Sequence, residues 1–196
     1  MKSFTKVLLA GTAILVITAP AFSQLEIAGG GGAASYRSDG VTQNKGKFLA
    51  SVSGDLGRFV AVGFEYGFVP LANETESSGG VVANGTEHFN TYGFVARVGL
   101  LPSRKLQPFV EIVGGGLRDT ATVSATSGGT TYSNSQSESG GYFGGGGGIN
   151  LGVGGGWGVR PEFRYQHVSI SQGGSANEMD FLGSLYYTFG GRHHRK

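Results

Sequence analysis

The chain has 196 residues, which suits one domain, and it has no cysteine, which excludes a disulfide framework and any thiolate site. Lysine and arginine number 15 against 13 aspartates and glutamates. Removal of Lys2 and Lys6 with a leader segment would leave 13 of each, so the remaining chain is formally neutral and gives no indication of nucleic-acid binding.

Met1 to Ser23 has the pattern of a secretory signal peptide. Lys2 and Lys6 form a positive start, Val7–Ile17 is mostly apolar, and Ala21-Phe22-Ser23 supplies small residues for cleavage. The apolar run is shorter than the roughly 20 residues of a membrane helix. We therefore expect an exported chain beginning near Gln24, which could enter a membrane only as a barrel.

The clearest strand pattern lies between Arg58 and Pro70. Large apolar side chains alternate with small or polar ones, so one face of the strand suits lipid and the other suits a polar lumen. The outward set is Val60, Val62, Phe64, Tyr66 and Phe68, and the opposite set is Ala61, Gly63, Glu65 and Gly67. Repetition of this pattern predicts a transmembrane β-barrel.

Eight segments of this kind follow one another along the chain. They are Leu25–Tyr36, Lys47–Asp55, Phe59–Val69, Asn90–Leu100, Pro108–Leu117, Tyr142–Val153, Trp157–Ile170 and Met179–Phe189. The sequence thus predicts an all-β, eight-stranded antiparallel up-and-down transmembrane β-barrel over residues 24–189, followed by a basic C-terminal tail at residues 190–196. The 38 glycines suit the tight bends of a small barrel.

The connections between these segments alternate in length, as in outer-membrane barrels with short periplasmic turns and long outer loops. Arg37–Gly46, Pro70–Phe89 and Arg118–Gly141 are long, whereas Leu56–Arg58 and Gly154–Gly156 are short. The long ones are rich in Ser, Thr, Asn and Gly. We expect them to be solvated, mobile extracellular loops, chiefly over residues 72–86 and 120–139.

Charged residues fall on the smaller face of these strands. Because a cation facing lipid at the membrane midplane costs roughly 2–4 kcal/mol, we expect them to pair inside the lumen. The expected lumen charge network is Glu65, Arg97, Glu111, Arg160, Glu162 and Arg164. An eight-stranded interior is just wide enough to be filled by side chains, which favours a closed plug over a conducting pore.

The last predicted strand ends in Leu185-Tyr186-Tyr187-Thr188-Phe189. With the leader segment and strands such as Arg160–Tyr165, it resembles the outer-membrane protein β-barrel domain family, small eight-stranded OmpA/OmpX-like barrels of Gram-negative bacteria. The resemblance covers nearly all of the exported chain. It implies location in the cell outer membrane, contact with outer-membrane lipids including lipopolysaccharide, and recognition by the barrel assembly machinery through Phe189.

His167 and Ser169 lie two apart on one strand, so a base and a hydroxyl could share the outer face. This pair resembles the His-x-Ser of lipid A deacylase barrels, in which Asn177 and an acid such as Glu178 or Asp180 would complete the site. By strand parity Asp180 faces inward. We therefore favour the alternative that His167 and Ser169 form a polar rim at the end of the strand.

Three functions remain open on the sequence. We expect an outer-membrane barrel with a structural or surface-interaction role that is not an enzyme. The alternatives are a lipid A deacylase-like hydrolase using His167 and Ser169, and a small passive channel. No cofactor or metal site is expected, because the runs Gly29–Gly32 and Gly144–Gly148 lack the Gly-Lys-Ser/Thr end of a phosphate-binding loop. The extracellular ligand is not indicated by the sequence.

Overall fold

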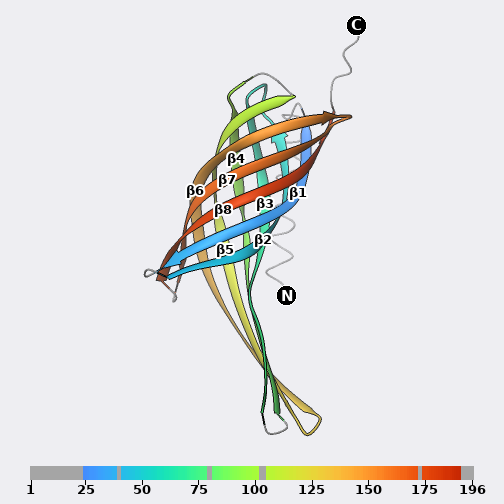
Figure 1. Ribbon diagram of the computed structural model, residues 1–196. Coiled ribbons are helices and arrows are strands. Elements are labelled where there is room, and N and C mark those ends of the chain that lie inside the picture. Colours follow the sequence, from blue (N-terminus) through green and yellow to red (C-terminus); the bar gives the residue numbers. More distant parts are fainter. Residues whose placement is uncertain (1–23, 39–40, 79–80, 102–104, 172–173, 191–196) are drawn as a thin grey trace, which may run out of the picture.

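The computed structural model describes residues 24–38, 41–78, 81–101, 105–171 and 174–190. Eight antiparallel strands follow in chain order and close into a ring in which the last strand pairs with the first (Figure 1). The strands are β1 (Leu25–Ser38), β2 (Val41–Asp55), β3 (Val60–Ser78), β4 (Val81–Gly99), β5 (Leu106–Ser127), β6 (Thr130–Gly154), β7 (Trp157–Ile170) and β8 (Gly174–Phe189). The predicted all-β, eight-stranded up-and-down architecture is confirmed. In the described part of the chain, no helix is long and apolar enough to span a membrane.

Strand alternation divides the wall into two faces. On β7 every second residue from Gly158 to Val168 is buried, and the residues between them are exposed or half-buried. The outward side chains include Phe94 at 71%, Ile112 at 68% and Phe143 at 67% exposure. Such a continuous apolar belt is unusual on a soluble monomer and is typical of a barrel wall in lipid.

Aromatic side chains gather near both ends of this belt. Trp157 and Tyr187 lie with ring centroids 4.9 Å apart, and Tyr187 contacts Phe189 at 4.7 Å. Near the other end Tyr66 pairs with Tyr92 across two strands, and both are exposed. Girdles of this kind mark the two interfaces of membrane barrels.

Glycines make room for inward side chains. A Cβ atom added to Gly158 would lie 2.1 Å from the ring of Tyr186, and one added to Gly93 would lie 2.6 Å from the Tyr142 hydroxyl oxygen. The high glycine content therefore serves the packing of a narrow lumen.

The predicted long loops are wrong in their conformation. Residues 72–78, 81–86 and 120–139 outside the turn continue β3, β4, β5 and β6 instead of forming irregular loops. Gly128 and Gly129, with φ of 56° and 83°, close the β5–β6 hairpin by a two-residue turn. These residues were not recognised as strands because Ser and Thr occupy both faces, so apolar and polar residues do not alternate. Their side chains still pair across neighbouring strands, as Thr122 does with Ser135.

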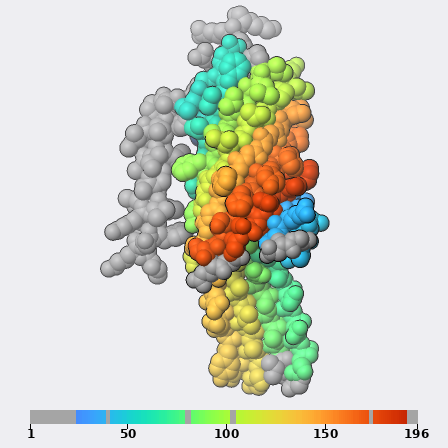
Figure 2. All heavy atoms as spheres, turned by 90° about the vertical axis from the view of Figure 1, so that its left-hand side faces the viewer, coloured from blue at the N-terminus to red at the C-terminus, as the bar shows by residue number. Residues whose placement is uncertain are grey.

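We call the four-stranded continuation of β3 to β6 beyond the ring the protruding sheet. β7 pairs with β6 only as far as Ile170 opposite Gly140, so residues 130–139 of β6 run on without β7, over about 30 Å. Figures 1 and 2 show the two hairpins projecting together from one end of the barrel. The long connections that were expected at one end of the barrel are therefore extensions of the strands, which form long hairpins there.

Candidate functional site: the charged lumen

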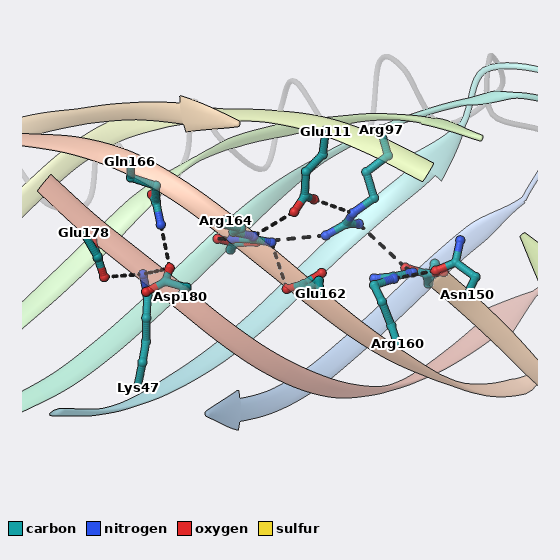
Figure 3. Close-up of polar contacts among 12 residues, drawn as sticks. Lys47, Arg97, Glu111, Asn150, Arg160, Glu162, Arg164, Gln166, Glu178 and Asp180 are labelled. Atoms are coloured by element: carbon teal, nitrogen blue, oxygen red, sulfur yellow. Dashed lines mark hydrogen bonds and ion pairs between the residues drawn. The ribbon is translucent and has the colours of Figure 1, made fainter. Parts of the chain in front are cut away.

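The barrel interior is lined by charged side chains from alternate strand positions. Arg160, Glu162 and Arg164 project inward from β7, and none is more than 6% exposed. Glu65 on β3, Arg97 on β4 and Glu111 on β5 lie on the same inner face, each 4% exposed. The structure therefore brings together in the lumen all six residues that the sequence suggested. Figure 3 labels five of them, all except Glu65.

Arg164 is the centre of this network and is fully buried. Its Nη1 and Nη2 donate to the two carboxylate oxygens of Glu65 at 2.5 and 2.8 Å, which is a bidentate pair. Its Nε donates to Glu111 Oε1 at 2.8 Å, and Nη2 lies 3.1 Å from Glu162 Oε1. One guanidinium thus joins strands β3, β5 and β7 across the lumen.

Two further arginines extend the network toward the end of the barrel with short turns. Arg97 Nε donates to Glu111 Oε2 at 3.0 Å, and Arg160 Nη2 donates to Glu26 Oε1 at 2.5 Å. Arg160 also donates from Nε to Asn150 Oδ1 at 2.6 Å. Its guanidinium lies 4.9 Å from the centroid of the Tyr186 ring, where the ring face attracts the cation.

A second cluster occupies the half of the lumen nearer the protruding sheet. Lys47 Nζ lies 2.8 Å from Glu178 Oε1 and 2.7 Å from Asp180 Oδ2. Gln166 Nε2 donates to the same Asp180 oxygen at 2.6 Å, and the Tyr36 hydroxyl donates to Glu178 Oε1 at 2.8 Å. This cluster joins β1, β2, β7 and β8.

Glu26 and Lys47 were not among the lumen residues expected from the sequence. Glu26 is the second residue of β1 and Lys47 was expected to begin its strand, so alternation could be checked on only one side of each. The structure starts β2 at Val41, which places Lys47 well inside it. Parity from its neighbour Phe48, which is 60% exposed on the outer face, places Lys47 on the inner face.

Within the described lumen the acids outnumber the bases. The bases are Lys47, Arg97, Arg160 and Arg164, and the acids are Glu26, Glu65, Glu111, Glu162, Glu178 and Asp180. Both signs alternate along the interior, so no single-sign field lines a path for ions. The same interior also holds the buried apolar cluster of Val95, Val113, Leu117, Tyr142 and Val168.

The outward face carries the proposed hydrolase pair. His167 is half-buried and Ser169 exposed, both on the outer face of β7. His167 Nδ1 lies 3.1 Å from Asn177 Oδ1 on β8. Glu178 and Asp180 lie in the lumen with Lys47, on the opposite side of the wall, so the structure does not bring these acids to His167.

Other predicted features lie at the margins. Phe189 is the last residue of β8 and is 44% exposed on the outer face. The expected signal peptide, residues 1–23, and residues 191–196 of the expected tail lie outside the described residues. No group of three or more His, Cys, Asp or Glu that could hold a metal occurs among the residues that the structure describes.

Comparison with known proteins shows a likeness in structure alone. No family model and no curated protein matches the sequence. The crystal structure of the attachment invasion locus protein Ail of Yersinia pestis, in complex with the heparin analogue sucrose octasulfate, is 14% identical with a TM-score of 0.60, covering 85% of this chain and 98% of Ail. Neisserial surface protein A, NspA, is 10% identical with a TM-score of 0.58, covering 84% of this chain and 96% of NspA. The chain therefore has the fold of the small eight-stranded outer-membrane barrels.

Proposed function

We propose that the chain is an outer-membrane barrel with a closed lumen and a structural or surface-interaction role. The observation that carries this proposal is the set of buried ion pairs by which Arg164 on β7 contacts Glu65 on β3 and Glu111 on β5 across the lumen. The apolar belt supports insertion in a bilayer. The aromatic side chains at its two ends support the placement of these ends at the two membrane interfaces. The protruding sheet then faces the outside of the cell.

The proposal excludes ion conduction through the lumen. Any path through it would have to break the contacts between Arg164, Glu65 and Glu111, and a buried charge without its partner is costly. Planar bilayer recording of the purified barrel should therefore show no defined conductance steps at neutral pH. Regular steps that change with Glu111→Gln would favour the passive channel instead.

The proposal also holds that His167 and Ser169 are not catalytic. Acyl hydrolysis by a histidine and a hydroxyl needs a group that orients the imidazole and donors that stabilise the oxyanion. Here Asn177 is the group at His167 Nδ1, and both nearby carboxylates belong to the Lys47 cluster. Mass spectrometry of lipid A from cells overexpressing the protein should be unchanged. Loss of an acyl chain that Ser169→Ala abolishes would establish the hydrolase.

Cell fractionation tests where the protein is located. We expect the exported chain to begin near Gln24 and to fractionate with the outer membrane, where its partners would be lipids including lipopolysaccharide. A purified chain that stays monomeric and soluble without detergent would overturn this part of the proposal.

A further inference from the structure

The outer wall of the barrel carries three polar side chains in one row. β8 lies between β1 and β7 in the ring (Figure 1). Asn177 on β8 is paired with Arg37 on β1 and, on its other side, with His167 on β7. Paired residues of neighbouring strands point to the same face, with Cβ atoms about 4.5–5.5 Å apart. Arg37, Asn177 and His167 therefore form a continuous row, which we call the outer polar row.

The outer polar row faces away from the lumen. Tyr36 and Glu178 bond each other inside the barrel. Their neighbours Arg37 and Asn177 therefore point outward, because successive residues of a strand alternate between its two faces. Arg37 and Asn177 are exposed, and His167 is half-buried. The row thus borders the medium that surrounds the wall at this end of the barrel.

Hydrogen-bond donors of the outer polar row are unused. His167 Nδ1 lies 3.1 Å from Asn177 Oδ1, and the imidazole is the donor in this contact because an amide oxygen only accepts. The amide nitrogen of Asn177 and the guanidinium of Arg37 bond no group among the described residues. Unused donors beside a cation suit an anion. A guanidinium suits phosphate in particular, since it can bond two phosphate oxygens in parallel.

The surroundings of the row carry charge of one sign. Each described acid of β1, β7 and β8 belongs to the ion-pair networks of the lumen. Among the described residues, no carboxylate therefore lies on the outer face of these three strands, and the positive charge of Arg37 is not cancelled there. This part of the wall attracts anions.

The row lies where the apolar belt ends. A tilted strand crosses the hydrocarbon of a bilayer in about 9–11 residues. Counted along β7 from Trp157, in the aromatic girdle near the short turns, this length ends at His167. Tyr165 and Met179, the next outward residues toward the belt, are 45% and 43% exposed. An acyl chain can therefore lie against the belt while the headgroup of the same lipid reaches the row.

We propose that the outer polar row binds the phosphate group of a membrane lipid. The guanidinium of Arg37 pairs with the phosphate, the amide N–H of Asn177 donates to it, and His167 positions that amide by bonding its oxygen. The acyl chains of the lipid lie along the apolar belt, a contact that free phosphate cannot make. This inference deepens the proposed contact with outer-membrane lipids and rests on the proposed insertion of the barrel in a bilayer.

The ligand is tested by native mass spectrometry of the purified barrel in maltoside micelles, which counts the lipids that each barrel retains. Phosphatidic acid differs from diacylglycerol with the same acyl chains only in its phosphate. We expect one phosphatidic acid to be retained at least about tenfold more strongly than diacylglycerol, and we expect an equal concentration of inorganic phosphate not to displace it. Equal retention of both lipids would overturn the phosphate preference, and displacement by inorganic phosphate would overturn a lipid as the ligand.

Variants of Arg37 separate the row from a general attraction of charge. Arg37→Gln should weaken retention of phosphatidic acid about tenfold or more, and Arg37→Lys, which keeps the charge without the planar fork, should weaken it less. Arg58→Gln is the matched control, because Arg58 is an exposed arginine in the turn between β2 and β3, at the opposite end of the barrel. Equal weakening by Arg37→Gln and Arg58→Gln would overturn the row in favour of unspecific attraction. Heat-modifiable mobility in gels shows that each variant is folded.

A double-mutant cycle tests the positioning role of His167. His167→Phe keeps an aromatic ring beside Phe143 but removes the donor to Asn177, and it should weaken retention of phosphatidic acid about threefold. Asn177→Leu removes the amide itself, and in that variant His167→Phe should have no further effect. A further loss of the same size in the double variant would overturn the positioning role.

The binding assay needs neither outer-membrane location nor a closed lumen. A barrel that conducts ions yet retains phosphatidic acid through Arg37 supports the outer polar row and refutes only the closed lumen of the proposed function. A barrel that conducts no ions and retains both lipids equally refutes only the row.

Discussion

The ring and the protruding sheet are built from the same strands, β3 to β6, yet different interactions connect their strands. Inside the ring Glu111 on β5 bonds two arginines, its neighbour Arg97 on β4 and Arg164 on the non-adjacent strand β7. Further along the same strand, Thr122 bonds Ser135 at 3.2 Å and Thr126 lies 2.9 Å from Thr131. The charges of the protruding sheet form no such network among the described residues, since its one arginine, Arg118, bonds a serine hydroxyl.

The difference follows from what surrounds each region. The charged side chains of the lumen are buried, and a buried charge without a partner is costly, so each acid requires a base or a donor close by. The residues of the protruding sheet are largely exposed, and at an exposed position an unpaired carboxylate costs little while a surface ion pair contributes little. Ion pairs therefore connect the strands inside the ring, whereas backbone pairing and hydroxyl contacts suffice to connect the strands of the protruding sheet.

The largest effect should come from removing the central guanidinium. Arg164→Met leaves Glu65 and Glu111 without their main partner in a buried site, and we expect a loss of about 3–5 kcal/mol in the free energy of unfolding. Urea unfolding in lipid vesicles, followed by the fluorescence of Trp157, the single tryptophan, measures it.

Arg118→Met is the matched control in the protruding sheet. Its side chain is exposed and donates to Ser137 at 3.2 Å, so we expect a change within about 0.5 kcal/mol. Equal losses in the two variants would show that water solvates the charges of the lumen as it does those of the protruding sheet.

An intermediate effect should follow a charge placed on the outer face. Phe163 is 41% exposed on the apolar belt and its ring lies 5.0 Å from that of Phe181. Phe163→Arg should cost about 2–4 kcal/mol in the same unfolding assay if that position faces the lipid midplane. Val123→Arg, at a position 59% exposed on the protruding sheet, should change little because water is already there. Similar costs at both positions would contradict the assignment of lipid to one region and water to the other.

The ring was predictable from sequence because its two faces differ in polarity. Phe163 and Tyr165 alternate with Glu162 and Arg164, and that contrast fixes both strand and orientation. The bounds of β7 were predicted to the residue. The inward placement of the six charges also follows from alternation, although their individual partners do not, because parity says nothing of which strands face each other across the lumen.

The protruding sheet was not predictable in the same way. Residues 130–139 are polar on both faces, so the period of two has no contrast to reveal it. The Gly128-Gly129 pair was the available signal, because two glycines in succession favour a two-residue hairpin turn. Lys47 was missed for a related reason, since the polar residues 42–45 precede it and hid the start of β2.

The smallest effect concerns Asp119, which lies two residue pairs beyond the last pairing of β6 with β7. Burial and the nearby Glu87 raise the pKa of its carboxyl group in the folded sheet. A raised pKa means that the folded state binds the proton more tightly than the unfolded state. The stabilisation from that proton is fully present below the ordinary aspartate pKa of about 3.9 and is lost as the pH rises through the folded value.

Asp119→Asn should therefore leave the protruding sheet slightly better protected at pH 7 and unchanged at pH 3. Hydrogen exchange measures this, as the ratio of the exchange rates of variant and wild type for the amides of residues 118–138 at each pH. We expect this ratio to differ from one by less than about threefold, because the carboxylate is partly solvated. Glu76→Gln, an exposed carboxylate near the tip, should leave the ratio near one at both pH values. Weaker protection of the Asp119→Asn variant at pH 7 would mean that the carboxylate has a stabilising partner. Solvation by water would then not be the reason why the protruding sheet tolerates its charges.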